Sequence, residues 1–463
     1  MRNRNLISLS SALAAFALQF GAVAPLRADD ASEIAALREQ IRLLDQKLRV
    51  LERKHELAEE AAAVAAPTAA KVSVNDRGYT LASGDAASSI RLRGLVQLDA
   101  RLFSGDGGIV NNAFVLRRAR LISEGQLGRK FGFSIFTEFG GATVSVLDAN
   151  FTVRLDRGLQ FKFGKFKSPV GLEQLQNDPV TFFNERSLAT NLVPNRDIGI
   201  EGSGELWGGR LNYQAGVFNG LADGGSSLNN TDFDNSKDFV GRVMVTPFRN
   251  VAASPVQGLS LGIAASAGDA RSASGRTSGY RTDGQQTFFT YQASVQADGQ
   301  NWRISPQLDY RRGPLGLMAE HVQSTANLRP AAGGAKTELQ NRAWQVAVGY
   351  VLTGEDSSFG GVSPRTNFDL AAGTWGAFEV VARVAGLKID DAAFPLFASP
   401  AVSAARADSY ALGLNWFLGK AVVFKIDYYH TDFGLHALAP AIPTTSLLRQ
   451  DEKALTSRFQ LTF

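Results

Sequence analysis

Basic side chains recur at alternate positions along this 463-residue chain, and they are the residues best suited to chemistry. Arg118 and Arg120 lie two residues apart, and Arg154 and Lys162 lie in two further segments with the same alternation. Side chains two residues apart in a β-strand share a face. If these faces enclose a lumen, their positive charge attracts anions, and low-dielectric walls strengthen the field. Alternatively, acidic side chains on the same faces pair with the cations and hold the wall together.

A second group of cations surrounds a long connection in the chain, and it consists of Lys162, Lys165, Lys167, Arg186 and Arg196. In a membrane barrel, strict alternation would turn Lys165 and Lys167 toward lipid, at a cost of ~2 to 4 kcal/mol each near the midplane. We therefore expect a β-bulge, or a strand end at Gly164, that turns both lysines into the pore mouth. For Arg186 we favour an ion pair that anchors the loop to the wall over direct contact with a substrate.

These cations depend on residues 159–196, which predict one strand followed by an unusually long connection. Leu159, Phe161 and Phe163 alternate with polar residues, as in a strand with one face toward lipid. The connection has about 29 residues, whereas hairpin loops usually have ~2 to 5. It carries more apolar side chains than a solvated loop can use, so we expect it to fold inward against a barrel wall and to narrow a pore.

Alternating segments continue to the C-terminus and predict an all-β fold, a 16-stranded antiparallel transmembrane β-barrel. A seventeenth candidate, 288–297, conflicts with the alternation of short turns and long loops. We therefore place it within a second inward-folding loop, at about 268–300. Residues 354–373 then form a long connection on the short-turn side. The sixteen predicted strands are 90–103, 115–127, 131–139, 145–155, 159–166, 198–207, 211–218, 239–246, 259–265, 302–310, 315–322, 344–352, 378–384, 410–417, 422–430 and 455–463.

The region before the barrel has three predicted parts. Residues 1–28 combine early arginines, an apolar stretch and small residues, which indicates a secretory signal peptide. Residues 29–60 place apolar residues only at heptad positions a and d, which favours a coiled-coil helix between protomers over a helix docked on its own protein. Residues 61–80 are a linker, and residues 81–463 form the barrel. The chain has no cysteine, so disulfides do not stabilise the exported protein.

Catalytic and metal-binding arrangements are not evident in the sequence. The four histidines, His55, His321, His430 and His436, are scattered, and no Ser–His–acid set or metal-ligand spacing includes them. We therefore expect neither enzyme activity nor a cofactor. Nucleic-acid-binding motifs are absent, and a formal charge of +4 is slight for a chain of this length, so we expect no nucleic-acid partner.

Several short motifs follow one another through the barrel region. They include Phe114-Val115-Leu116-Arg117-Arg118-Ala119-Arg120, Gly164-Lys165-Phe166-Lys167-Ser168-Pro169, Glu185-Arg186-Ser187, Ile304-Ser305-Pro306-Gln307, Leu352-Thr353-Gly354-Glu355 and Leu412-Gly413-Leu414-Asn415-Trp416. In this order they resemble the phosphate-selective porin O and P family over most of residues 80–463. The alternating C-terminal segment that ends in Phe463 is also typical of outer-membrane barrels.

The resemblance implies a homotrimeric porin in the lipid of the cell outer membrane that passes phosphate, pyrophosphate or other small anions. It also implies that the third and fifth loops narrow the pore, and that the coiled coil holds the trimer or reaches toward the cell wall. The alternatives are a general, non-specific porin and a barrel that anchors the coiled coil as a structural tether. The candidate anion-binding or pore-lining residues are Arg118, Arg120, Arg154, Lys162, Lys165, Lys167, Arg186 and Arg196.

Overall fold

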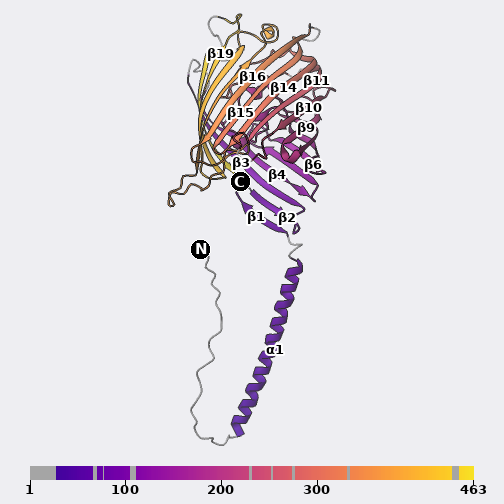
Figure 1. Cartoon of the computed structure of the whole chain (residues 1–463), viewed down its shortest axis with the longest axis vertical. Coiled ribbons are helices and arrows are strands. Elements are labelled where there is room, and N and C mark those ends of the chain that lie inside the picture. The colour runs from indigo at the N-terminus through magenta and orange to yellow at the C-terminus, as the bar shows by residue number, and fades with distance from the viewer. Residues whose placement is uncertain are drawn as a thin grey trace. The chain divides into compact units, whose positions relative to one another are not determined.

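The computed structural model divides the chain into two compact units, Met1–Ala69 and Ala70–Phe463 (Figure 1). The described residues are 28–65, 70–76, 78–104, 111–228, 232–251, 254–273, 277–330, 334–440 and 448–463. Helix α1 belongs to the first unit, and all of the strands belong to the second. Nearly all of the predicted signal peptide lies outside the described residues.

Helix α1 (Ala28–Ala65) runs without interruption through the segment predicted as a coiled coil, and it continues five residues further. The extension contains several alanines, which have the highest helix propensity. Ile41, Leu44 and Leu51 of the predicted a/d seam are more than 60% exposed, so the described part of this unit provides no partner for the stripe. Among the described residues, the structure shows no helix whose length and apolar content would let it cross a membrane.

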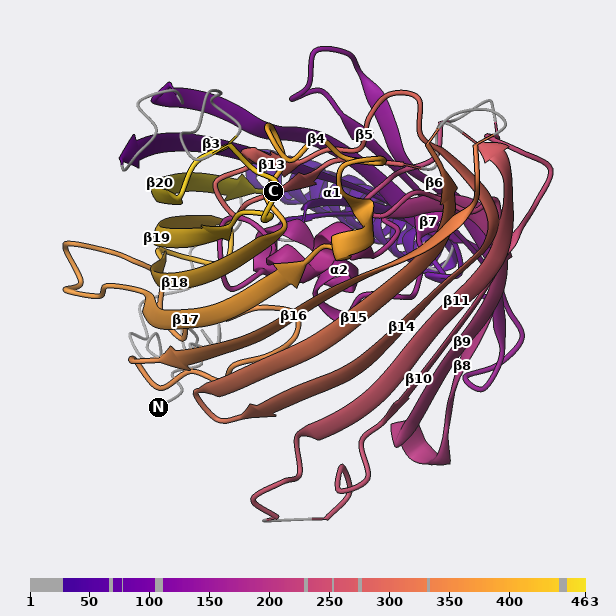
Figure 2. The same cartoon turned by 90° about the horizontal axis from the view of Figure 1, so that it is seen from above.

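Sixteen antiparallel strands close into a barrel, as Figure 2 shows from above. Each strand pairs with the next one along the wall, and β20 pairs with β3, so that Leu455 lies opposite Leu102. Every segment predicted as a strand overlaps one of the sixteen, and the predicted barrel is confirmed. The wall consists of β3 (Ser89–Ser104), β4 (Ala113–Leu127), β5 (Phe131–Glu138), β6 (Ser145–Arg154), β7 (Gln160–Lys167), β8 (Arg196–Leu206), β9 (Leu211–Phe218), β10 (Asp238–Val245), β11 (Leu259–Ala273), β14 (Gln296–Arg312), β15 (Leu315–Arg329), β16 (Thr337–Val351), β17 (Ala377–Lys388), β18 (Arg406–Phe417), β19 (Val422–Gly434) and β20 (Asp451–Thr462).

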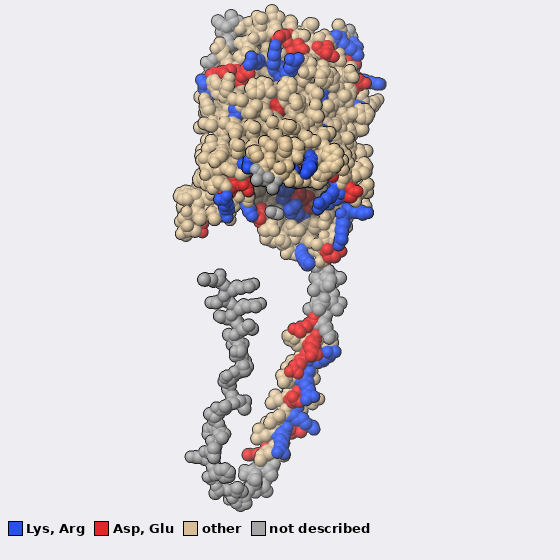
Figure 3. Space-filling model, viewed as in Figure 1, with Lys and Arg blue, Asp and Glu red and all other residues tan. Residues whose placement is uncertain are grey.

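The wall alternates as its sequence does. In β18, Ser409 and Asn415 are buried inside the barrel, whereas Tyr410 and Leu412 on the other face are more than half exposed. The face of the barrel in Figure 3 carries a broad band with few charged residues, and Lys, Arg, Asp and Glu gather toward its two ends. An apolar band between charged rims is the surface that a bilayer requires of a barrel.

The segment before the barrel differs from the predicted linker. Strands β1 (Lys71–Asn75) and β2 (Gly78–Ala82) form an antiparallel hairpin, and β2 extends the sheet along β3. The hairpin covers the edge of β3 next to the point where β20 ends, because Tyr79 lies opposite Leu92 and Thr462 lies opposite Leu95. The alternation of Val72, Val74, Tyr79 and Leu81 was the signal for these strands, but five-residue strands are hard to tell from linkers.

The connection between β7 and β8, here named L3 (residues 168–195), folds into the barrel as predicted. It contains the short helices α2 (Leu172–Leu175), η1 (Asp178–Val180) and η2 (Leu188–Leu192). Phe183, Leu188 and Leu192 are fully buried. Their burial against the inner wall removes apolar surface from water, which stabilises the folded-in position.

The described part of the connection between β11 and β14, here named L5 (residues 277–295), also packs inward. It carries the two-stranded sheet of β12 (Tyr280–Arg281) and β13 (Thr287–Phe289). Tyr280, Phe288 and Phe289 are buried in the same apolar cluster as Leu188 and Leu192 of L3. Residues 288–295 therefore belong to this inward-packed loop and not to a wall strand, as the turn pattern predicts. Only the last two residues of the seventeenth candidate belong to β14.

The long connection between β16 and β17, here named the lower connection (residues 352–376), enters the barrel from the short-turn end. Gln176 of L3 donates a hydrogen bond from Nε2 to the carbonyl of Phe359 at 3.1 Å, and Phe359 packs against the apolar cluster that includes Phe182. Arg311 of β14 donates to Ser357 Oγ at 3.1 Å. Two segments that enter from opposite ends of the barrel therefore meet inside it.

Candidate functional site

L3 is fastened to the inner wall along β15, β16 and β17 by a network of carboxylates and their donors. The carboxylate of Glu320 accepts the backbone N–H groups of Leu172 (2.8 Å) and Glu173 (3.2 Å), and it also accepts Gln345 Nε2 at 3.0 Å. Arg383 Nη1 lies 3.3 Å from the carboxylate of Glu173. The first turn of α2 therefore has its backbone donors satisfied by the wall, which fixes the entry of L3 into the lumen.

Glu185 and Asp178 of L3 are each bound by three arginines. Arg101, Arg117 and Arg458 reach Glu185 at 3.3, 2.6 and 3.0 Å. The guanidinium groups that bind Asp178 come from Arg118, Arg120 and Arg186. Five of these six arginines belong to the wall, so the two carboxylates tie L3 to β3, β4 and β20.

Both carboxylates are held ionised. Burial alone would raise the pKa of Glu185, but Arg117 and Arg458 outweigh it and hold the pKa far below the usual range. Burial also opposes ionisation of Asp178, and the charges of Arg118, Arg186 and Arg120 outweigh it, so its pKa is lowered as well. The anchors of L3 are therefore ion pairs at any pH at which ordinary carboxyl groups are charged.

Arg117 is a functional residue that strict alternation missed. Alternation places Arg118 and Arg120 inside the barrel and Arg117 outside, toward lipid. The register of β3 and β4 shifts between Gln97 and Leu98, and the shift turns Arg117 inward to Glu185. The signal was available, since a lipid-facing arginine is as costly as the outward lysines that already indicated a bulge.

Four of the eight candidate residues have a carboxylate partner. Arg118 and Arg120 bind Asp178, and Arg120 also donates from Nε to Glu138 at 2.6 Å. Arg186 stays within L3, where it binds Asp178 at 2.5 Å and the carbonyl of Gln176 at 2.7 Å. It thus holds the loop to itself, whereas the predicted ion pair joined the loop to the wall. Arg196 binds Asp148 at 3.1 Å.

The two lysines that follow Gly164 have different surroundings. Lys165 donates from Nζ to the carbonyls of Val146 (3.1 Å) and Ser227 (2.7 Å), and it is not among the residues that line the described lumen cavities. Lys167 lines the lumen, and its Nζ lies 2.5 Å from the carbonyl of Gln176. Gly164 has φ +115°, where other residues are strained, and an added Cβ would lie 2.2 Å from the carbonyl of Ala149. Strand β7 nevertheless continues to Lys167 with no register shift against β6 or β8, so the predicted β-bulge or strand end at Gly164 is not present. Lys167 faces the lumen, whereas Lys165 lies beneath a neighbouring loop.

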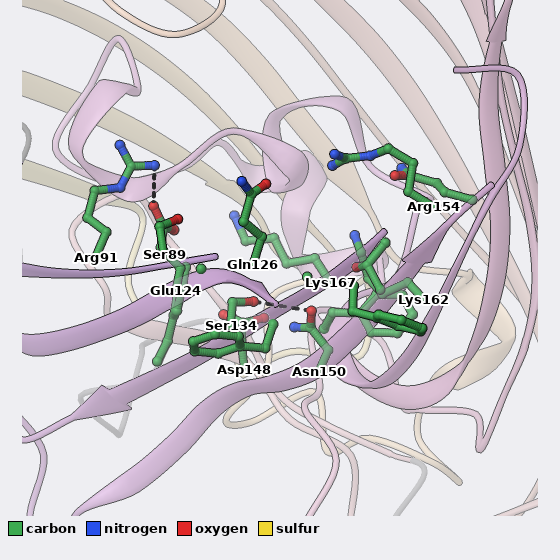
Figure 4. Close-up of a pocket in the computed structure, with 18 of the residues that line it drawn as sticks. Ser89, Arg91, Glu124, Gln126, Ser134, Asp148, Asn150, Arg154, Lys162 and Lys167 are labelled. Carbon is green, nitrogen blue, oxygen red and sulfur yellow. Dashed lines mark hydrogen bonds and ion pairs between the residues drawn. The ribbon is translucent and has the colours of Figure 1, made fainter. Parts of the chain in front are cut away.

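A cavity of about 790 Å³, here named the basic cavity, lies along the inner faces of β3 to β8 and extends to the β4–β5 turn (Figure 4). Leu175 and Asn177 of L3 contribute to its lining. A second cavity of about 660 Å³ continues along β6 to β14 and shares Arg154 and Lys162 with it. Seven basic and two acidic side chains line the basic cavity: Arg91, Arg129, Lys130, Arg154, Lys162, Lys167, Arg196, Glu124 and Asp148.

Arg154, Lys162 and Lys167 are the candidates that remain available to a solute. Within the described part of the chain, none of the three has a carboxylate oxygen within 4 Å. Figure 4 shows all three around the basic cavity. Lys162 Nζ lies 5.0 Å from the ring centroid of Phe166, within the range of a cation–π contact. The described residues contain no group of three or more His, Asp or Glu side chains that could hold a metal ion.

A closed barrel with an apolar outer band and an inward-folded loop defines the porin class of outer-membrane channels. The chain belongs to a family whose model, phosphate-selective porin O and P, matches residues 90–463. The resemblance drawn from the motifs is thereby confirmed, and so is the outer-membrane location. The family is one of channels and not of enzymes.

Solved structures share this fold at low sequence identity. The outer-membrane channel DcaP of Acinetobacter baumannii has a TM-score of 0.52 and 12% identity, with 82% of this chain and 98% of that chain covered. Salmonella typhi OmpF in complex with daunomycin has a TM-score of 0.52 and 12% identity, with 85% and 100% covered. A loop-deletion mutant of Vibrio cholerae OmpT reaches 0.50 and 11%, with 81% and 100% covered. No curated protein matches the sequence significantly.

Proposed function

We propose that this porin is a passive channel that favours small anions, with phosphate and pyrophosphate as candidate substrates. The carrying observation is the set of Arg154, Lys162 and Lys167 on the basic cavity, each without a carboxylate within 4 Å in the described structure. Low-dielectric walls strengthen the field of such charges, so they raise the local concentration of anions and lower that of cations.

The charge balance of the basic cavity supports the same direction. Its seven basic side chains outnumber its two acidic ones. The acids are already engaged, because Glu124 binds Arg91 and Arg93, and Asp148 binds Arg196. A cation that enters this space therefore meets few unshared carboxylates, whereas an anion meets free donors.

We also propose that three copies of the chain assemble through α1. Six large apolar residues of the a/d seam are exposed in the single chain, and a coiled coil with two further copies would bury them. The seam comprises Ile34, Leu37, Ile41, Leu44, Leu48 and Leu51. The family resemblance supports the trimer, and the secretory leader at residues 1–28 and a reach of α1 toward the cell wall remain predictions from the sequence.

Phosphate competition tests the proposed function. Purified full-length protein in a planar bilayer carries a chloride current, and phosphate or pyrophosphate is added on one side. If the free cations bind phosphate, the chloride current should fall in the millimolar range or below, and pyrophosphate should act at lower concentration because it carries more charge. A chloride current that neither ion reduces would indicate a general porin. A channel that prefers cations would contradict the proposal.

A further inference from the structure

A third cavity of about 400 Å³, here named the lower cavity, lies between L3 and the lower connection. Its lining includes η1 of L3 and Gly360–Ser363 of the lower connection, together with the inner faces of β3, β4, β18 and β19. It shares Arg91, Lys167 and Arg196 with the basic cavity, so the two cavities adjoin. Its volume lies within the range of ~300 to 1,000 Å³ that is typical of small-molecule sites.

One side of the lower cavity is apolar. Phe417 and Val423 are buried in a cluster at the short-turn end of the wall, and Val362 of the lower connection packs against them. Leu95 (2% exposed) and Ile122 (8% exposed) continue this surface on β3 and β4. These side chains point inward, where a channel lining is usually polar. Contact with lipid therefore does not explain why these positions are apolar.

The remaining side of the lower cavity is basic. Six cationic side chains line it, and five carboxylates bind them. Arg91 and Arg93 share Glu124, Arg120 has two carboxylate partners, and Lys167 has none among the described residues. One of the five, Asp178, also binds Arg118 and Arg186. The cavity therefore keeps an excess of positive charge. The six cations are Arg91, Arg93, Arg120, Lys167, Arg196 and Lys420.

We propose that the lower cavity binds amphiphilic anions, meaning an anionic head on an apolar body about the size of a phenyl ring. The head would lie near the ammonium group of Lys167 and the guanidinium groups of Arg91 and Arg93, which share one carboxylate. The body would lie against Val362 and Val180, whose side chains are only partly buried, and remove their remaining surface from water. Inorganic phosphate gains nothing from that apolar side, so the lower cavity prefers organic anions to inorganic ones. This proposal rests on the anion preference of the channel.

Two pairs of probes isolate the apolar body from the head. Phenyl phosphate is compared with inorganic phosphate, and benzoate is compared with acetate, as blockers of the chloride current of full-length protein in planar bilayers. Benzoate and acetate have the same carboxylate head, so a difference within that pair belongs to the ring. Phenyl phosphate and inorganic phosphate are compared at pH 8, where both carry about two negative charges. We expect half-block by phenyl phosphate at an about tenfold lower concentration than by phosphate. A similar ratio for benzoate over acetate would show that the carboxylate head is accepted as well, and a ratio near one would restrict the site to phosphate esters.

Two variants place the effect in the lower cavity. Val362→Ser on the lower connection and Val180→Ser on η1 of L3 each remove apolar surface from one side of it. Each should raise the half-blocking concentration of phenyl phosphate severalfold and leave that of inorganic phosphate unchanged. The matched control is Leu370→Ser, which changes an exposed side chain of the same connection that does not line the cavity.

Equal block by phenyl phosphate and phosphate in the unmodified protein would overturn the proposal and leave the anion preference intact. It would also be overturned if Val362→Ser weakened both blockers to the same extent, since that result indicates a change of L3 and not of the site. A channel selective for cations would contradict the proposed function itself, and the sign of the reversal potential separates this outcome from the others.

Discussion

Arg117 of β4 donates two hydrogen bonds to the carboxylate of Glu185 in L3, from Nε to Oε1 at 2.6 Å and from Nη2 to Oε2 at 2.9 Å. Such a two-pronged pair adds geometric specificity to charge. It joins residues 68 positions apart and fixes the middle of L3 against the wall. Several of the arginines that give the sequence its basic character are therefore committed to holding the loop, and only a few remain for solutes.

Replacement of Glu185 tests this commitment. In Glu185→Gln, Arg117 loses its only carboxylate partner among the described residues. The loss should cost about 3 kcal/mol of loop anchoring, at the low end for a buried pair because the Arg117 side chain is 28% exposed. Single-channel recording should show higher conductance and noisier open levels. The control is Glu338→Gln, which changes an exposed glutamate of β16 that lines none of the described cavities. A quiet Glu185→Gln channel of unchanged conductance would contradict the anchoring role.

Acid should release L3 only at low pH. Asp178 and Glu185 have lowered pKa values in the folded protein, so their ionised forms contribute stability above the usual carboxyl pKa of ~4. That contribution is lost as the pH falls through the lowered values. We expect these two anchors to hold from pH 7 to about pH 4, so the noisy open levels of Glu185→Gln should appear in the unmodified channel only below about pH 4. Noise that rises between pH 7 and pH 5 would show that other groups hold the loop.

The free cations of the basic cavity should set ion selectivity. Arg154→Gln and Lys162→Gln each remove a charge that has no carboxylate within 4 Å, and each should lower the chloride-to-potassium permeability ratio by on the order of twofold. Lys388→Gln is the control, because this side chain is 62% exposed at the far end of β17. If all three variants changed the ratio equally, the effect would belong to overall charge and not to the cavity.

Two glycines of the lower connection allow a matched test of its contact with L3. Gly361 (φ +94°) and Gly373 (φ +65°) both have backbone angles that strain other residues. A Cβ at Gly361 would lie 2.9 Å from Val180 of L3, whereas a Cβ at Gly373 would have no atom within 4 Å. We expect Gly361→Val to displace η1 and alter single-channel conductance, and Gly373→Val to leave it unchanged. Similar recordings from the two variants would mean that the contact does not position L3.

Deletion of residues 31–66 tests the role of α1. The truncated protein should conduct as before in each pore but should lose its trimers at a lower temperature, because the exposed apolar seam would no longer join the copies. Electrophoresis of samples that were first heated to increasing temperatures measures the temperature at which the trimers dissociate. A detached cell envelope with trimers of unchanged stability would instead favour the tether interpretation.

The barrel was predictable because each strand carries its own signal, an alternation of apolar and polar residues along a short stretch of sequence. Lipid on one side and a wet lumen on the other force alternation, and that pattern is legible at Tyr410 and Leu412 of β18 as it is throughout the wall. The inward fold of L3 was also predictable, since Phe183 and Leu188 need burial that a solvated loop cannot give. Length and apolar content were sufficient evidence for both.

The site was harder to predict because it depends on pairs that are distant in sequence. The sequence around Asp178 does not indicate that its carboxylate binds Arg118 and Arg120. Nor does the sequence around Gly164 indicate that Lys165 turns away from the lumen while Lys167 faces it. The lower connection gave no sequence signal for its entry into the barrel, since its contact with L3 joins residues 183 positions apart. Strand pairing and loop docking decide which cations stay free.

The sign of the reversal potential in a potassium chloride gradient tests the anion preference most directly. The unmodified full-length protein is inserted into a planar bilayer between solutions of high and low salt, and the zero-current voltage is read. We expect the sign that chloride permeation produces, reduced in size by Arg154→Gln and Lys162→Gln. A voltage of the opposite sign would show that potassium passes more readily, and it would contradict a channel built around free cationic side chains.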